Sequence, residues 1–197
     1  MQQITNVSVT AYDDAYRTML EKCSSLILPV LSEFFGEAFT GNETVTLNQN
    51  ELFISTPDGS SYERITDSSF QVIGDTVKKR YHLECQSTKD QTIMLRLFEY
   101  DSQIALDHSV LKDDRLVVEF PQSALIYLRS NEHTPDEMIL EIRTPEGQSV
   151  SYCVPVMKLQ SYELQELFDK KLWFLLPFHS FCYESRLKES ESNEEKH

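Results

Sequence analysis

The sequence has little glycine, no long apolar run and few basic residues. Five glycines among 197 residues exclude collagen-like and glycine-rich architectures. The longest apolar stretches, 26–31 and 172–178, are too short to cross a bilayer. Residues 1–10 lack the basic segment and apolar run of a secretory signal. We therefore expect a globular protein that neither spans a membrane nor is secreted.

The cysteine spacing and the charge balance indicate which metal sites, disulfides and binding partners to expect. Cys23, Cys85, Cys153 and Cys182 form no Cys-x-x-Cys pair and have no histidine at zinc-ligand spacing. Neither a zinc site nor a disulfide framework is indicated, so a cytoplasmic location is expected. Lys and Arg number 18 against 32 Asp and Glu, and this net charge of -14 repels nucleic acid from the surface as a whole. Any contact with phosphates must come from a local basic patch.

Hydrophobic periodicity predicts helices alternating with short strands. The expected helices are 14–39, kinked or divided at Pro29, then 91–107, and 162–176, which Pro177 ends or bends. The expected strands are 51–56, 65–73, 78–86, 116–120, 124–129, 137–143 and 149–157. This order predicts one α+β domain over 1–183: a helix, a three-stranded antiparallel meander, a second helix, further strands and a C-terminal helix. The segment 184–197 is charged, so we expect a frayed helix or a disordered tail there.

The turn between strands 65–73 and 78–86 predicts their register. With the turn centred on Asp75 and Thr76, the numbers of antiparallel partners sum to 151, so Asp67 lies opposite Glu84. Directly opposed side chains lie about 5 Å apart at Cβ, and two carboxylates so placed repel each other. A divalent cation held by both carboxylates and by the backbone carbonyl of Cys85 would compensate. The alternatives without a metal are a solvated sheet face, or Asp67 serving as a turn or hydrogen-bonding residue.

Alternation along strand 78–86 separates two sets of side chains. One face carries His82, Glu84 and Gln86, and the other carries Tyr81, Leu83 and Cys85. We expect the second face to be the buried one because it is apolar. A single histidine on a strand is more often a structural hydrogen-bonding residue than a ligand, so His82 is left out of the candidate site.

Three segments, in this order, resemble the PD-(D/E)XK nuclease superfamily. They are Ile-Thr-Asp-Ser-Ser-Phe at 65–70, Tyr-His-Leu-Glu-Cys-Gln-Ser at 81–87 and Met-Leu-Arg-Leu-Phe-Glu-Tyr at 94–100. The likeness is to the recombination-promoting nuclease and transposase group of clostridial-type bacteria, in which Glu-x-Gln replaces Glu-x-Lys. It extends more loosely from residue 13 to residue 184. The resemblance implies a restriction-endonuclease-like core.

The resemblance also implies a reaction, which is Mg²⁺- or Mn²⁺-dependent hydrolysis of DNA. Asp67 would be the motif aspartate, Glu84 the second metal-binding carboxylate, and Gln86 would occupy the lysine position. Glutamine can position a water by hydrogen bonding but carries no charge. A further glutamate from the first helix is common in the superfamily, and Glu33 is the candidate, with Glu37 one turn later as the alternative.

Basic residues gather around the motif although the chain is acidic. They are Lys78, Lys79, Arg80, Lys89 and Arg96. Arg96, Arg80 and Lys89 are the expected contacts to DNA phosphates, and Arg96 is the strongest because it follows the motif on a helix. For Lys78 and Lys79 a solvated strand edge protected by lysine is an equally good explanation.

Two other classes of function are compatible with the sequence. The chain could be a non-catalytic nuclease-like scaffold that binds a protein partner or DNA. Alternatively, its acidic surface could mimic DNA and occupy a nucleic-acid-binding partner. A homodimer is left open under each interpretation.

Overall fold

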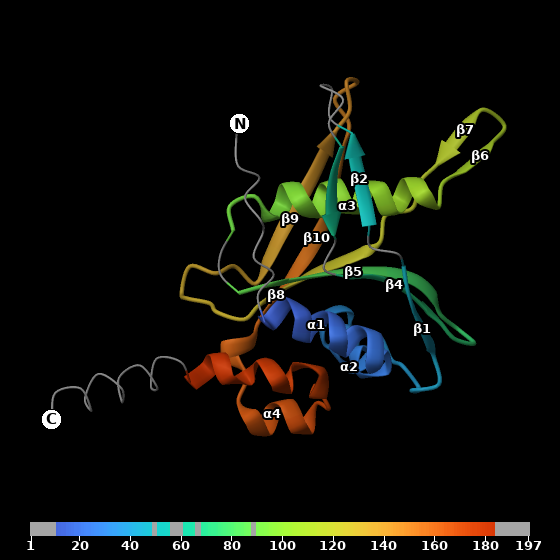
Figure 1. The fold of residues 1–197 in the computed structure, drawn as a ribbon. Helices are drawn as coiled ribbons and strands as arrows, with labels where there is room; N and C mark the ends of the chain where they lie inside the picture. The colour runs from blue at the N-terminus through green and yellow to red at the C-terminus, as the bar shows by residue number, and fades with distance from the viewer. Residues whose placement is uncertain (1–10, 49–50, 56–60, 66–67, 88–89, 184–197) are drawn as a thin grey trace, which may run out of the picture.

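A computed structural model describes residues 11–48, 51–55, 61–65, 68–87 and 90–183 (Figure 1). Its centre is a six-stranded mixed sheet in the order β1-β4-β5-β8-β10-β9. The strands are β1 (Thr44–Leu47), β4 (Ser68–Ile73), β5 (Lys78–Gln86), β8 (Gln122–Tyr127), β10 (Ser149–Lys158) and β9 (Glu137–Arg143). The pairs β5–β8 and β8–β10 are parallel, and the other neighbours are antiparallel. The expected mixture of helices with a sheet is confirmed at this level.

The first predicted helix is divided into three pieces. They are α1 (Ala11–Lys22), the 3-10 helix η1 (Ser24–Ile27) and α2 (Leu28–Phe35). The break comes at Cys23, ahead of Pro29, which lies in the first turn of α2. Proline is tolerated there because the first N–H groups of a helix have no partner within it. Gly36, with φ 64°, ends α2 before the predicted residue 39.

The β4–β5 hairpin has the predicted register. Its pairs run from Ser68 opposite Leu83 to Ile73 opposite Lys78, and each pair sums to 151. The register prediction is therefore confirmed for the described part of the hairpin. Asp67 lies outside the described residues, so its pairing with Glu84 stays a prediction.

The remaining strand of the antiparallel meander is not the predicted one. It is β1, which pairs with β4. The predicted strand at 51–56 exists as β2 (Glu51–Ser55), but it pairs with β3 (Ser61–Ile65) in a separate two-stranded sheet. Of the predicted strand 65–73, Ile65 is the last residue of β3 and residues 68–73 form β4.

A single helix connects β5 to β8, as the sequence predicts. This helix is α3 (Ile93–Asp107), and the hairpin of β6 (Val110–Lys112) and β7 (Arg115–Val117) follows it. The sequence predicts the region of β7 but not β6. At the C-terminus the predicted helix 162–176 is divided into α4 (Leu164–Asp169) and the 3-10 helix η3 (Trp173–Tyr183), and the short 3-10 helix η2 (Leu159–Ser161) precedes them. Lys171, with φ 57°, separates the two, and Pro177 lies inside η3 without ending it.

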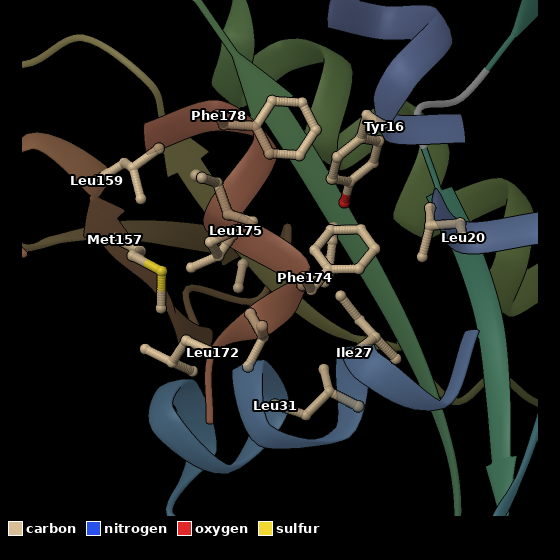
Figure 2. Close-up of a cluster of buried hydrophobic side chains, with 14 of the residues drawn as sticks. Tyr16, Leu20, Ile27, Leu31, Met157, Leu159, Leu172, Phe174, Leu175 and Phe178 are labelled. Carbon is tan, nitrogen blue, oxygen red and sulfur yellow. The ribbon is translucent and has the colours of Figure 1, made fainter. Parts of the chain in front are cut away.

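Helices cover both faces of the sheet. Figure 1 shows α3 on one side and α1, α2 and α4 on the other. The larger core lies on the second side, where Tyr16 meets Phe174 edge to face with ring centroids 5.4 Å apart (Figure 2). The smaller core lies under α3, where Ile93 and Leu97 pack on β8 and β10. No helix within the described residues has the length and apolarity needed to span a bilayer.

Candidate functional site

A cluster of buried polar side chains lies between β5 and α3. His82 and Glu84 come from alternate positions of β5, and Asp101 comes from α3. His82 and Asp101 are 0% exposed and Glu84 is 1% exposed. The expectation that only the apolar face of β5 is buried is therefore wrong. Helix α3 covers His82 and Glu84 on the polar face, whereas Arg80 and Gln86 at its two ends are only half-buried.

Asp101 is the anchor of this cluster. Its Oδ1 atom accepts hydrogen bonds from the Ser123 hydroxyl and from His82 Nδ1, both at 2.7 Å. Its Oδ2 atom accepts a bond of 2.9 Å from the Tyr152 hydroxyl. A buried carboxylate needs such donors because it has lost its hydration. The bonds fix Asp101 against three strands of the sheet, β5, β8 and β10.

His82 connects Asp101 to Glu84. Its Nε2 atom lies 3.4 Å from Glu84 Oε1, and its ring meets Tyr100 edge to face. Burial alone lowers the pKa of His82, but the carboxylates of Asp101 and Glu84 raise it more, to about 9. The imidazole is consequently a cation at neutral pH and bridges two carboxylates.

Two predicted site residues, Arg96 and Gln86, contact a third, Glu84. Its Oε2 atom accepts a hydrogen bond of 2.8 Å from Arg96 Nη2 and one of 3.2 Å from Gln86 Nε2. Arg96 also donates to Asp90 Oδ2 at 3.3 Å. The predicted grouping of Glu84, Gln86 and Arg96 is thus present in the structure. Arg96 is held by carboxylates and not presented alone to the surface.

Glu33 and its alternative, Glu37, make their contacts elsewhere. Glu33 accepts hydrogen bonds from Tyr162 at 3.0 Å and from Lys170 at 2.6 Å, next to α4. Glu37 accepts from Tyr81, whose side chain lies on the face of β5 opposite Glu84. The contacts of these two carboxylates therefore lie on the other side of the sheet from Arg96 and α3.

The predicted phosphate contacts are spread out. Arg80 lies four residues before Glu84 on β5, and its Nη1 atom is 3.9 Å from Glu119 Oε2. Arg96 is the predicted contact that reaches Glu84. Lys89, like Asp67, lies outside the described residues.

Sequence reasoning set His82 aside and missed Asp101 and Tyr127. Asp101 lies four residues after Leu97 and so falls on the apolar stripe of α3, which is the signal that could have identified it. Tyr127 is opposite Gln86 in the β5–β8 ladder, and its buried hydroxyl has no hydrogen-bond partner among the described residues. Burial raises the pKa of Tyr127, and nearby Asp90 raises it further.

The donors at Glu84 match a hard divalent cation in type. Glu84 and Gln86 offer carboxylate and amide oxygens, which Mg²⁺ and Mn²⁺ prefer. Cys85, whose carbonyl is the further predicted ligand, lies opposite Ile126 in the β5–β8 ladder. The part of the chain that the structure describes contains no cluster of three His, Cys, Asp or Glu able to hold a metal. Arg96 already supplies one positive charge to Glu84, so a second carboxylate, such as Asp67, is required to complete such a site.

The chain was compared with models of protein families, with curated proteins and with solved structures. None of them matches it. The geometry around Glu84 therefore carries the functional argument.

Proposed function

We propose that the chain is a metal-dependent DNA endonuclease of the transposase-associated PD-(D/E)XK type. The observation that carries the proposal is the environment of Glu84, a buried carboxylate whose Oε2 atom is held by Arg96 and Gln86. A buried carboxylate beside a guanidinium and an amide, beneath a helix and at the carboxyl end of a strand, is suited to organising charge for phosphodiester hydrolysis. The substrate proposed is DNA, and the cofactor proposed is Mg²⁺ or Mn²⁺.

The order of elements supports this proposal. The antiparallel strands β1, β4 and β5 are followed by α3 and then by β8, which is parallel to β5. The restriction-endonuclease-like core implied by the resemblance has the same succession of a helix, three antiparallel strands, a helix and a further strand. The fold is therefore compatible with a nuclease, although fold alone never defines an activity.

Each residue has a separate role in the proposed reaction. Glu84 and Asp67 would hold the cation, which when bound polarises the scissile phosphate and a nearby water. Gln86 can accept a hydrogen bond from that water through its amide oxygen while its Nε2 group donates to Glu84. The water would lose a proton to solvent as it adds to phosphorus, the bond to the leaving oxygen would break and that oxygen would take up a proton from solvent, and Arg96 would offset the charge that develops on the phosphate.

One observation favours a second candidate function, a non-catalytic scaffold that binds DNA or a protein partner. Arg96 and His82 already neutralise Glu84, so this carboxylate is compensated by the protein itself. In addition, Gln86 supplies no charge where the superfamily pattern has lysine. Under this interpretation the cluster stabilises the fold and the surface does the binding.

Cleavage of supercoiled plasmid in the presence of Mg²⁺ or Mn²⁺ distinguishes the nuclease from the non-catalytic scaffold. The parent is expected to convert the plasmid to nicked and linear forms, and Glu84→Gln is expected to lower the rate by at least about a hundredfold, the scale of losing one preorganised electrostatic contact. The substitution keeps the shape of the side chain and removes its charge. Circular dichroism checks that the variant is folded.

Glu141→Gln is the matched control, because Glu141 lies on β9 and bonds to Arg143 at an exposed place far along the sheet. This control must cleave as the parent does. Equal cleavage by parent and Glu84→Gln would reveal a contaminating nuclease. An inert parent would leave the scaffold as the better explanation.

A further inference from the structure

An open groove of about 510 Å³ lies at the beginning of β5. Lys78, Lys79 and Arg80 line it together with Glu119, Phe120 and Gln122. Lys79 is neutralised by Glu37 at 2.7 Å, which leaves Lys78 and Arg80 beside Glu119 and gives this place a local excess of positive charge on a chain of net charge -14. A polyanion repelled by the rest of the surface would find attraction here.

Two polar atoms of the groove lack hydrogen-bond partners. Arg80 Nε and Gln122 Oε1 are both buried, and neither has a partner among the described residues. Arg80 is further paired only loosely with Glu119, at 3.9 Å, and the Glu119 side chain is 79% exposed. Buried polar atoms in native proteins are normally paired. The Nη atoms of Arg80, whose side chain is 21% exposed and only loosely paired, therefore offer donors that suit a phosphate oxygen.

An aromatic ring lies in the wall of the same groove. Phe120 is 37% exposed, and its ring stacks on Phe98 at a centroid distance of 6.3 Å and an interplanar angle of 15°. Tyr152 supports the ring at 5.9 Å. A ring held from behind and partly open is a platform on which a nucleobase can stack.

The groove and Glu84 lie along one strand. Arg80 and Glu84 share a face of β5 because their positions differ by an even number of residues. Four residues of strand correspond to about 13 Å. His82 lies between them and is fully buried beneath α3, so the groove is a binding surface separate from Glu84.

We propose that this groove binds a single strand of nucleic acid. Lys78 and Arg80 contact phosphates, and Phe120 stacks on a base. Bases within a duplex are stacked on one another, so their faces are not open to Phe120. Binding in the groove does not depend on the proposed nuclease function.

Fluorescence anisotropy with a labelled oligonucleotide of about 20 nucleotides, in EDTA so that no cleavage occurs, tests the groove. Charge reversal in Lys78→Glu/Arg80→Glu should weaken binding at least about tenfold and reduce the slope of log K against log salt by about 1.4, because each single-strand phosphate contact contributes about 0.7. Phe120→Leu, which keeps an apolar side chain but removes the ring, should weaken binding about tenfold with the slope unchanged.

Lys22→Glu/Arg143→Glu is the matched control. It makes the same change of net charge at exposed positions on α1 and β9. The control should bind within about twofold of the parent, and the parent should prefer the single strand to the same sequence as a duplex. A parent that binds no oligonucleotide at low salt, or a control that loses as much affinity as the groove variant, overturns the proposal. The proposal is also overturned if the parent binds the duplex more tightly than the single strand and Phe120→Leu leaves that affinity unchanged.

The plasmid assay separates this proposal from the proposed activity. Groove-dependent binding by a protein that does not cut plasmid supports the groove and contradicts the nuclease. If the parent cleaves plasmid but Lys78→Glu/Arg80→Glu binds the oligonucleotide as tightly as the parent, the result supports the nuclease and overturns the groove.

Discussion

At the scale of single residues, Asp101 is the side chain on which the buried cluster depends. Replacement by Asn keeps its shape but removes the charge that faces His82. The imidazolium would then keep Glu84 as its remaining carboxylate neighbour. Removing one member of a buried ion pair destabilises strongly, so Asp101→Asn should lower the free energy of unfolding by about 3 kcal/mol. Urea denaturation followed by circular dichroism measures this loss as a lower midpoint at constant slope.

The control for this prediction is Asp107→Asn at the C-terminal end of the same helix. Asp107 is exposed and accepts a hydrogen bond from Gln103. Its replacement should change the free energy of unfolding by less than about 0.5 kcal/mol. If Asp101→Asn costs no more than this control, the cluster does not stabilise the fold as described.

The contacts of Asp90 lead to a prediction about how the stability of the fold depends on pH. Its Oδ1 atom accepts hydrogen bonds from the backbone N–H and the hydroxyl of Thr92 just before α3, and these bonds lower the pKa of Asp90 below its ordinary value of 3.8. A carboxyl group whose pKa is lower in the folded state stabilises the fold above its unfolded pKa. That stabilisation is lost as pH falls through the folded pKa.

Asp90→Asn should therefore be less stable than the parent at pH 7, by about 1 kcal/mol for the lost charged hydrogen bonds. The difference should be constant above about pH 5 and should shrink below it as Asp90 in the parent becomes protonated. Urea midpoints measured at several pH values provide the test. A difference that grows as the pH falls would show that the sign of the shift is wrong.

The candidate site could be predicted only in part at this scale. Strand alternation places His82, Glu84 and Gln86 on one face, and the structure agrees. Alternation does not say what covers that face, because burial there depends on α3, which comes later in the chain. The contact between Arg96 and Glu84 likewise depends on how that helix packs.

At the scale of elements, η3 closes the larger core. Phe174 is fully buried in it and contacts Tyr16 (Figure 2). Its neighbour Trp173 is 45% exposed. Phe174→Ala should cost about 3–5 kcal/mol, because it leaves a cavity between η3 and α1. Trp173→Ala, the matched control, should cost less than about 1 kcal/mol. Equal losses in thermal or urea unfolding would contradict this description of the core.

Elements with clear local signals agree best with prediction. Strand β5 begins and ends where the sequence predicts, and so does β9, because turn residues flank each alternating run. The helix predicted at 14–39 is divided as expected, but at Cys23 and not at Pro29, and the helix predicted at 162–176 is divided at Lys171. Their apolar spacing continues across the breaks, since the flanking pieces pack on the same core, and periodicity cannot detect such a break.

At the scale of the whole molecule, the order of strands in the sheet could not be predicted from local sequence patterns. The sequence predicts the succession of elements, but strand β10 lies between β8 and β9. This insertion depends on long-range pairing that no local pattern encodes. The sequence places strand 51–56 in the main sheet for the same reason, whereas β2 pairs with β3 in a separate sheet.

The net charge of -14 leads to a prediction for the entire molecule. Like charges on one compact surface repel each other, and dissolved salt screens this repulsion. At pH 7, raising sodium chloride from about 10 mM to about 200 mM should therefore raise the melting temperature by about 2–4 °C, equivalent to roughly 1 kcal/mol for a chain of this length. The buried pairs at Glu84 are little affected by salt, so they do not oppose the rise. Near pH 5, close to the isoelectric point of about 4.7, the same salt should change the melting temperature much less. A melting temperature that falls with salt at pH 7 would mean that attractive surface ion pairs outweigh the acidic repulsion.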